Sequence, residues 1–381
     1  MRITIHSTMK TILILTFFVI SFFLLSFKLS NNSDKKKLET LDTWKDILID
    51  GKDIAGVRSD GTAWVWKNGK TEQVGSDKDW EKFFLCTPYI CQKEDGTIWS
   101  WNDEAHPNLG YKVSGNSFLT PHMIGADKWK SVSGGRTVFG IKSDGTMYVW
   151  GILTEDFTNE VYVKQYEPLR IWNYDNWESI SSKINQEFIL GIQNDGSLWA
   201  CGQNKWGEFG NGTKVSSNVP VRVGSDNDWV KVSTEGINGA FAIKKDGTLW
   251  AWGHSAYTSR KPQGLELPLG SEKDSAATVP MQLGTDSDWL DIAAGDFHRI
   301  ALKKDGTLWS WGKSLGLTQD RGKISMVQVG TDNDWVKIDA GLYISVAIKK
   351  DGTAWLWGEN KNGQLGLNTT LEIVSQPMQL K

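Results

Sequence analysis

The chain has 381 residues, a formal net charge of −3 and 21 tryptophans. Hydrophobic residues make up 39% of it and charged residues 23%, which excludes wholesale disorder. The small negative charge argues against nucleic acid as a partner, since proteins that bind it usually carry a basic excess. Three cysteines are too few for a disulfide scaffold, and nine prolines without a Gly-X-Y period exclude collagen.

The first segment with a clear pattern is the apolar run 11–27, TILILTFFVISFFLLSF. Arg2 and Lys10 precede it, as in a secretory signal, and a helix of this length would span about 25 Å. No small-x-small cleavage site follows, because Phe27 and Lys28 stand where small residues are wanted. The sequence therefore predicts a secreted or membrane-anchored protein, with its large domain outside the cytoplasm. Its parts are a signal peptide or signal anchor at 1–29, a polar linker at 30–42 and the domain at 43–381.

The rest of the chain repeats one string, Asp-Gly-Thr/Ser-x-Trp/Tyr, seven times. The copies begin at Asp60, Asp95, Asp144, Asp195, Asp246, Asp305 and Asp351. Each is preceded, 15 to 18 residues earlier, by a lead tryptophan: Trp44, Trp80, Trp129, Trp177, Trp229, Trp289 and Trp335. These two families account for 19 of the 21 tryptophans and leave only Trp172 and Trp206. The tryptophan excess is therefore architectural.

Each repeat predicts short β-strands in a fixed order. In the fifth repeat we expect strands at 229–233, 240–243 and 248–252, with a type I′ hairpin turn at Asp246-Gly247. A variable segment then leads to a fourth strand of the kind seen at 219–224. Four short strands in a unit of about 50 residues are typical of a propeller blade. The predicted fold is all-β, a seven-bladed β-propeller of four-stranded antiparallel blades, preceded by one N-terminal apolar helix.

Two motifs add a resemblance to a known family. AAGDFHRIALKKDGTLWSWG at 293–312 and WGENKNGQLG at 357–366 resemble the repeat of the regulator of chromosome condensation family. A further copy of the second motif stands at 201–213, and the resemblance extends over 44–380. It implies a propeller but leaves the function open, because the family includes nucleotide exchange factors for small GTPases, histone binders, β-lactamase inhibitors and exported bacterial proteins.

The chain departs from the family pattern at several places. The family repeat usually carries a histidine after its second turn, but here only the sixth repeat does, as His298, while Arg136 and Tyr343 stand nearby in the third and seventh. The resemblance implies a structural histidine, hydrogen-bonded at the end of the channel; acid–base chemistry beside Asp296 is the alternative. The fourth repeat has Cys201 where others have tryptophan.

The longest insertion, 254–280, carries Tyr257, Arg260 and Lys261. Tyrosine and arginine are enriched at binding hot spots, and loops on a rigid scaffold often carry function. The alternative is a passive insertion, which loop entropy tolerates well. The second long segment, 102–128, is similar but less aromatic.

Acidic clusters such as Ser225-Asp-Asn-Asp-Trp229 precede most lead tryptophans. They are either turns or a ring of carboxylates for a cation or a basic partner, and one pair in each blade is too few for the six to eight oxygens of a calcium site. Cys86 and Cys91 flank a short turn. They either form a disulfide or are two small buried side chains.

The sequence contains no Ser/His/Asp order, paired-histidine metal spacing or Gly-rich phosphate loop, so we expect no catalytic residue, metal ligand or cofactor. It predicts a monomeric, non-enzymatic scaffold that binds a protein partner through its face loops. The candidate partner-binding residues are Tyr257, Arg260, Lys261, Arg136, His298 and Tyr343. Glycan or cell-wall binding, guanine nucleotide exchange and a propeller hydrolase or lyase are the alternatives.

The C-terminal segment, Gln376-Pro377-Met378-Gln379-Leu380, has the pattern of a fourth strand with no blade after it. An open seam would leave unpaired sheet edges. We therefore expect this segment to pair with the first blade, formed from 44–66, so that the two chain ends share one sheet.

Overall fold

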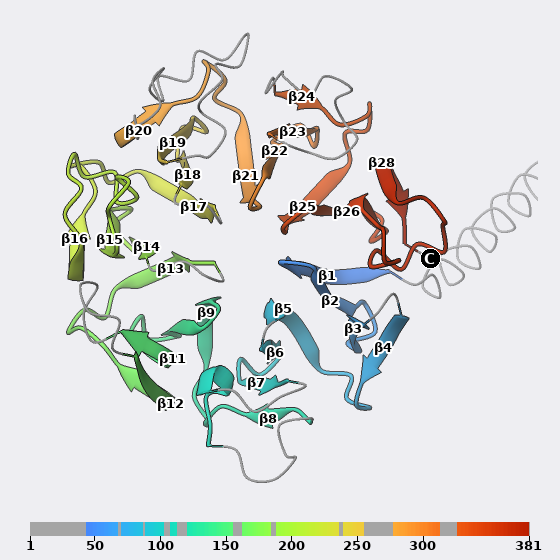
Figure 1. Cartoon of the computed structure of the whole chain (residues 1–381), viewed down its shortest axis with the longest axis horizontal. Coiled ribbons are helices and arrows are strands. Elements are labelled where there is room, and N and C mark those ends of the chain that lie inside the picture. The colour runs from blue at the N-terminus through green and yellow to red at the C-terminus, as the bar shows by residue number, and fades with distance from the viewer. Residues whose placement is uncertain are drawn as a thin grey trace, which may run out of the picture. The chain divides into compact units, whose positions relative to one another are not determined.

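The computed structural model describes residues 43–67, 70–86, 88–102, 107–112, 120–154, 162–183, 188–235, 239–254, 277–312 and 326–380. These form seven four-stranded antiparallel sheets around a central channel (Figure 1), which confirms the predicted seven-bladed β-propeller. The predicted signal or anchor and the linker lie outside the described residues. No helix in the described ranges has the length and apolar character needed to cross a membrane.

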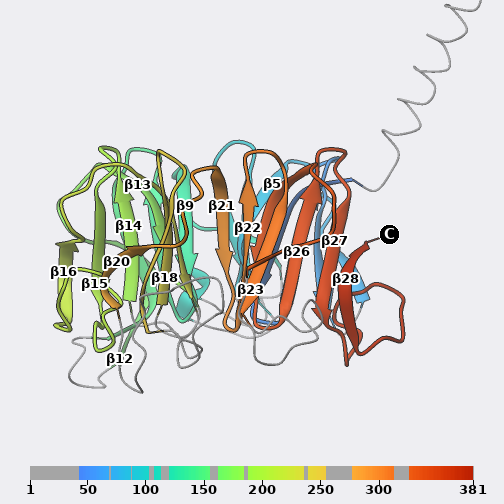
Figure 2. The same cartoon turned by 90° about the horizontal axis from the view of Figure 1, so that it is seen from above.

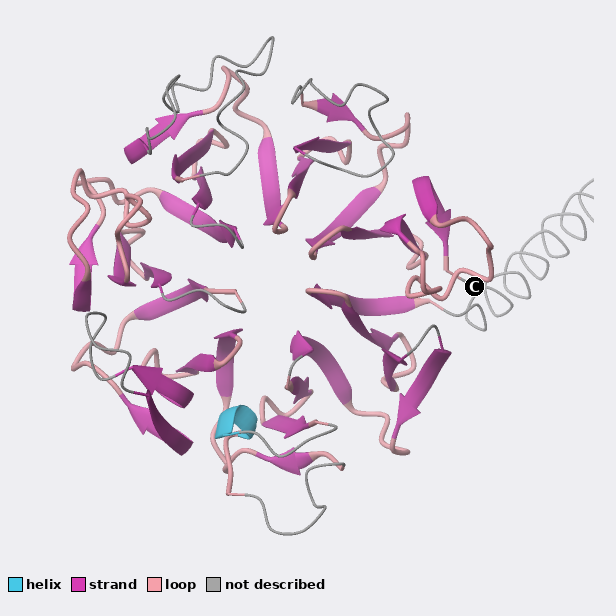
Figure 3. Cartoon of the chain, viewed as in Figure 1, coloured by secondary structure: helices cyan, strands magenta, loops and turns pink. Residues whose placement is uncertain are grey.

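Each blade consists of four consecutive strands that follow one another outward from the channel (Figure 3). The first three blades are β1 (Trp44–Asp50), β2 (Asp53–Arg58), β3 (Ala63–Lys67) and β4 (Lys70–Val74); β5 (Trp80–Cys86), β6 (Tyr89–Lys93), β7 (Ile98–Trp101) and β8 (His122–Met123); and β9 (Trp129–Gly134), β10 (Thr137–Lys142), β11 (Met147–Thr154) and β12 (Tyr162–Arg170). The short 3-10 helix η1 (Pro107–Leu109) lies between β7 and β8.

The remaining four blades follow the same order. They are β13 (Trp177–Ser181), β14 (Phe188–Gln193), β15 (Leu198–Gly202) and β16 (Ser217–Arg222); β17 (Trp229–Glu235), β18 (Gly239–Lys244), β19 (Leu249–Gly253) and β20 (Ala277–Gln282); β21 (Trp289–Ala294), β22 (His298–Lys303), β23 (Leu308–Gly312) and β24 (Val327–Gln328); and β25 (Trp335–Ala340), β26 (Ile344–Lys349), β27 (Ala354–Glu359) and β28 (Ile373–Gln379).

A chain of hydrogen bonds links the Asp, Thr and Trp of the repeated Asp-Gly-Thr-x-Trp string. In blade 5, Asp246 Oδ1 accepts from the backbone N–H and the hydroxyl of Thr248 (2.9 and 2.7 Å). The same hydroxyl accepts from the indole N–H of Trp250 (2.8 Å). These bonds to Thr248 lower the pKa of Asp246. The Asp thus orients the Thr hydroxyl and the Thr hydroxyl orients the indole, which explains why the three residues recur at a fixed spacing.

The hairpin turn differs from the predicted type I′. Gly247 has φ +87°, but Asp246 is not among the described non-glycine residues with positive φ. The Gly247 N–H bonds to the carbonyl of Lys244 (2.8 Å), as in a type I turn followed by a glycine in the left-handed region. The expected I′ turn was wrong, because the Asp side chain binds the backbone two residues on and holds its own residue at negative φ.

A lysine links the acidic clusters to the tryptophans, and its two carboxylates and two indole rings are here called the lysine cage. In blade 6, Lys303 Nζ lies 2.8 Å from Asp286 Oδ2 and 3.1 Å from Asp288 Oδ1. It also lies 4.8 and 5.1 Å from the ring centroids of Trp289 and Trp309. Burial alone would lower the pKa of Lys303, but the bonds to the two carboxylates outweigh it and the pKa is raised. The same cage surrounds Lys93, Lys244 and Lys349.

Blade 4 changes the lysine and both carboxylates of the cage together and keeps the two tryptophans. Gln193 replaces the lysine, and Asn176, which stands where blade 6 has Asp288, donates its amide to Gln193 Oε1 (3.1 Å). A lysine without its carboxylates would be a partly buried, uncompensated charge, which is costly. The acidic clusters therefore hold a cation of the protein itself in most blades.

The lead tryptophans pack between neighbouring blades and also link them by hydrogen bonds. The Trp289 N–H, for example, bonds to the carbonyl of Gly247 in the preceding blade (3.1 Å). The innermost strands add bonds from side chain to backbone. Ser181 Oγ accepts from Thr234 N–H, Ser233 Oγ from Ala294 N–H and Asp339 Oδ2 from Ile49 N–H.

The ring closes without sharing a sheet between the chain ends, so the expected pairing of 376–380 with the first blade was wrong. β28 pairs with β27 in blade 7, and β4 completes blade 1. Closure uses the contacts that join every other pair of blades: the Trp44 N–H bonds to the carbonyl of Gly352 (2.7 Å), and Trp44 and Trp66 share a core with blade 7. Because 70–74 supply a fourth strand, blade 1 has no vacant edge for the C-terminus.

We predict that Lys303→Met lowers the free energy of unfolding by about 1–3 kcal/mol, because it removes two cation–π contacts and leaves two carboxylates facing each other. Lys304→Met, at the exposed neighbouring position, should change it by less than about 0.5 kcal/mol. Urea unfolding of the three proteins measures both effects. Equal losses in the two variants would show that the cage adds no stability.

Candidate functional site

The propeller has two faces that are built from different connections (Figure 2). Because successive strands are antiparallel, the turn after each first strand and the loop after each third strand lie on one side, here called the loop face. The Asp-Gly hairpins and the connections between blades lie on the other side, the turn face. Variation among the repeats is concentrated in the loops after the third strands.

Three of the predicted partner-binding residues lie on the loop face. Arg136 is exposed in the turn between β9 and β10, and Tyr343 is half-buried in the turn between β25 and β26. The Tyr343 ring stacks on Phe297 with centroids 4.6 Å apart and an angle of 10°. His298 opens β22 in the blade beside it. The structure thus places Tyr343 and His298 in adjacent blades and Arg136 in blade 3.

His298 is buried and hydrogen-bonded. Its Nε2 lies 2.6 Å from Ser345 Oγ in the neighbouring blade. Burial, helped by the charge of Lys183, lowers its pKa to about 4, so the imidazole is neutral at pH 7. This environment agrees with the structural histidine that the family resemblance implies, and a partner cannot reach the ring directly.

Lys183 crosses the channel at the loop face, a feature that sequence analysis missed. It follows β13 in blade 4, and its ammonium donates to the carbonyl of Ala340 in blade 7 (3.0 Å), on the opposite side of the ring (Figure 1). Burial raises the pKa of Asp339 and of Asp296, and the positive charge of Lys183 partly offsets both shifts. No motif marks this contact, because its two ends lie 157 residues apart.

Trp206 is the exposed aromatic residue of the loop between β15 and β16. It is 39% exposed, and its ring lies 4.8 Å from that of His254 at an angle of 33°. Two buried side chains hold the loop: Asn204 Oδ1 accepts from Phe209 N–H (2.9 Å), and Glu208 Oε2 accepts from Trp206 N–H (2.7 Å). The sequence signal for this residue was its place outside both tryptophan families.

The other three predicted residues, Tyr257, Arg260 and Lys261, lie outside the described residues. β19 ends at Gly253 and β20 begins at Ala277, both at the loop face. His254, the last described residue before that segment, is the one whose ring lies against that of Trp206, tilted by 33°.

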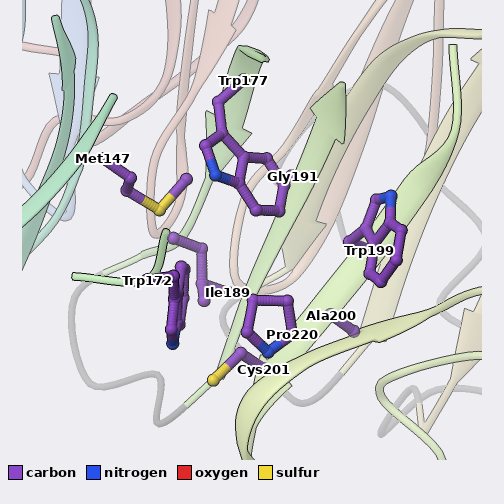
Figure 4. Close-up of a pocket in the computed structure, with 9 residues that line it drawn as sticks. All are labelled: Met147, Trp172, Trp177, Ile189, Gly191, Trp199, Ala200, Cys201 and Pro220. Carbon is purple, nitrogen blue, oxygen red and sulfur yellow. The ribbon is translucent and has the colours of Figure 1, made fainter. Parts of the chain in front are cut away.

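A small apolar hollow lies between blades 3 and 4, where Cys201 replaces the second tryptophan of the motif. Figure 4 shows the indole rings of Trp172, Trp177 and Trp199 around the smaller side chains of Ile189 and Pro220. Trp172, with φ +53°, packs against the core cluster that contains Cys201. Trp172, which belongs to neither tryptophan family, thus takes up part of the space that Cys201 leaves.

Cys91 is a free, buried thiol, so the possible disulfide with Cys86 is not formed. The register sets Cys91 opposite Phe83 and Cys86 opposite Tyr89. Cys91 occupies the position that holds glycine or alanine in the other blades, where the lead tryptophan ring packs; a Cβ at Gly56 would lie 2.9 Å from the Trp44 ring. The described residues include no group of His, Cys, Asp and Glu that could hold a metal ion.

Family models of the regulator of chromosome condensation (RCC1) repeat match residues 195–234 and 351–381, and a second model of the same repeat matches 289–320 and 335–364. The RCC1 domain-containing protein RUG3, mitochondrial, of Arabidopsis thaliana is 26% identical over 224 residues, 53% of this chain and 46% of RUG3. The ultraviolet-B receptor UVR8 of the same plant is 24% identical over 58% of this chain and 49% of UVR8. The chain therefore spans about half the length of these curated relatives.

Among solved structures, yeast RCC1 (Prp20) bound to Kap60 resembles the chain with a TM-score of 0.67 at 20% identity, over 82% of this chain and 78% of that one. At this identity the likeness establishes the fold and nothing about activity.

We predict that the stability of the protein depends on the protonation of His298. Its pKa of about 4 lies below the unfolded value of 6.5, so the unfolded state binds more protons between these pH values. The stability due to the neutral ring is complete above pH 6.5 and is lost as the pH falls toward 4, by up to about 3 kcal/mol. Unfolding of wild type and His298→Gln at pH 7, 5.5 and 4 isolates this contribution, because the opposite effects of Asp296 and Asp339 are common to both. If the free energy of unfolding of the two proteins changed with pH in the same way, the prediction would be contradicted.

Proposed function

We propose, from the premise that the chain belongs to the RCC1 repeat family, that it is a non-enzymatic scaffold that binds a protein partner through its loop face. The observation that carries the proposal is the exposed indole of Trp206 beside the longest insertion. Buried aromatic anchors dominate the affinity of protein interfaces, and tryptophan is the most enriched of them.

The fold does not require a tryptophan at position 206. The loop of blade 7 has the same plan: Asn360 Oδ1 accepts from Leu365 N–H (3.1 Å), as Asn204 does from Phe209 in blade 4. In that loop the residue that corresponds to Trp206 is Asn362. An aromatic ring that packing does not demand, held on a braced loop, supports a role in binding.

The polar groups at the mouth of the channel support binding over catalysis. His298 bonds to Ser345, Lys183 to the carbonyl of Ala340, and Asp339 to the N–H of Ile49. Catalytic groups converge on a substrate position, whereas these described groups point to one another. The protein character of the partner is supported by the solved relative that is described as bound to Kap60.

The apolar run 11–27, with Arg2 and Lys10 before it, supports a location outside the cytoplasm. We predict that the full-length protein fractionates with membranes or is secreted, and that removal of residues 11–27 retains it in the cytosol. Immunoblots of cell fractions measure this. Recovery of the uncleaved, full-length protein from the cytosol would contradict the location.

We predict that Trp206→Asn weakens partner binding by tenfold or more, about 1.4 kcal/mol, without changing thermal unfolding, because it restores the residue of the blade 7 loop. Asn362→Ala is the matched control at the equivalent position. Captures from an envelope extract by wild type and both variants, quantified by mass spectrometry, identify proteins that depend on Trp206 alone.

If wild type and both variants captured the same proteins, the binding site would not include Trp206. Loss of polysaccharide rather than protein from the Trp206→Asn capture would favour glycan or cell-wall binding, since a flat exposed ring also suits a sugar. A turnover that is abolished by His298→Ala would overturn the non-enzymatic function.

A further inference from the structure

One residue follows each lead tryptophan at the start of each innermost strand, on the turn face. These seven positions are here called the rim, and the residue types found there divide the ring into two parts. From blade 1 to blade 7 these rim residues are Lys45, Glu81, Lys130, Glu178, Val230, Leu290 and Val336. They hold equivalent positions, because the N–H of each lead tryptophan bonds to the glycine carbonyl of the preceding hairpin. The fold therefore accepts charged and apolar side chains alike at this rim.

The rim residues of blades 1 to 4 form two ion pairs with one another. The ammonium of Lys45 pairs with the carboxylate of Glu81, and that of Lys130 pairs with Glu178. This part of the rim has no net charge and no large apolar group.

Blades 5 to 7 instead present what we call the apolar crescent: Val230, Leu290 and Val336, which are 53%, 53% and 46% exposed. Their strands, β17, β21 and β25, are neighbours around the channel (Figure 1). Just inside the rim, Lys231 Nζ pairs with Asp291 Oδ1 at 2.7 Å, which links the first two of these strands. Three half-exposed apolar side chains on neighbouring strands, which the fold does not require, suit a surface that another molecule covers.

The same three blades, like blade 2, carry pairs of carboxylates on the turn face. Each pair shares a single lysine, and the Lys and Asp that follow this lysine in the hairpin offset each other. These five charged groups therefore leave one negative charge on the turn face of each of the three blades. The pairs with their lysines are Asp226 and Asp228 with Lys244, Asp286 and Asp288 with Lys303, and Asp332 and Asp334 with Lys349. One carboxylate of each pair has half of its side chain exposed.

We propose that the apolar crescent and these carboxylates form a second interaction surface, which binds a basic segment of a protein partner that carries apolar side chains among its lysines and arginines. The apolar side chains would cover the crescent, and the cations would lie near the carboxylates. The excess negative charge of these carboxylate pairs disfavours an anionic lipid surface or a nucleic acid. The surface lies on the opposite face from Trp206 and does not depend on it.

The test is selection of peptides from a random library displayed on phage, with the immobilised full chain as target. The enriched peptides should combine lysine or arginine with leucine, isoleucine, valine or phenylalanine. Synthetic copies, measured by fluorescence anisotropy, should bind Leu290→Asp at least about tenfold more weakly than wild type, and should also bind more weakly at high salt. Leu290 is half exposed, so the variant should keep the thermal unfolding of the wild type.

Two variants are matched controls. Glu178→Gln changes the equivalent rim position in blade 4, and Trp206→Asn changes the loop face; both should bind the peptides as wild type does. The proposal is overturned if no peptide is enriched over a blank surface, if the enriched peptides are acidic, or if Leu290→Asp binds them as tightly as wild type. Because Trp206→Asn reports on the other face, failure here is distinguishable from failure of the loop-face site.

Discussion

The structure depends on the packing of one tryptophan at the start of each blade. Blades are wedge-shaped sheets that cannot bury both faces alone, and the flat indole fills the space between them with the largest contact area that a side chain offers. This packing explains the small residue on the second strand, Gly56 or Cys91, because a larger one would clash with the ring. It also explains the lysine cage, since carboxylates compensate a cation that lies partly buried over two indoles. Blade 4, which lacks the cation, lacks both carboxylates too.

Because the hairpins and the bonds between blades recur in nearly the same form around the ring, the rest of the surface is free to vary. The Asp-Gly hairpins are nearly identical, whereas the loops after the third strands differ in length and content. A departure in one blade changes the contacts next to it: Trp252 Nε1 donates to the carbonyl of Glu208 in the loop of the preceding blade (2.8 Å), whereas Cys201, at the equivalent position of blade 4, has no indole N–H that needs an acceptor. A difference between repeats therefore reports on either packing or binding, and the contacts of the residue that differs show which of the two applies.

Sequence analysis predicted the blades and most strands, because the motifs that mark them are the residues that hold them. It erred on the closure of the ring for a physical reason. The fourth strand is the outermost and least buried, so 70–74, KTEQV, shows no apolar or proline pattern, whereas Pro377 marks the C-terminal strand clearly. Among site residues, Trp206 left a trace as a tryptophan outside the repeat. Lys183 left none, since its partner lies three blades away and nothing local constrains it.

Closure of the ring without a shared sheet has a consequence for function. Since no strand is exchanged, Trp44 meets Gly352 with the same hydrogen bond that Trp289 makes to Gly247, and all seven seams are of one kind. The two faces are then built from opposite ends of the same strands, which lie several residues apart along hydrogen-bonded sheets. A substitution at Leu290 on one face changes no contact of Trp206 on the other. Such a scaffold can evolve a binding surface on each face independently, which is how a single fold comes to serve unrelated partners.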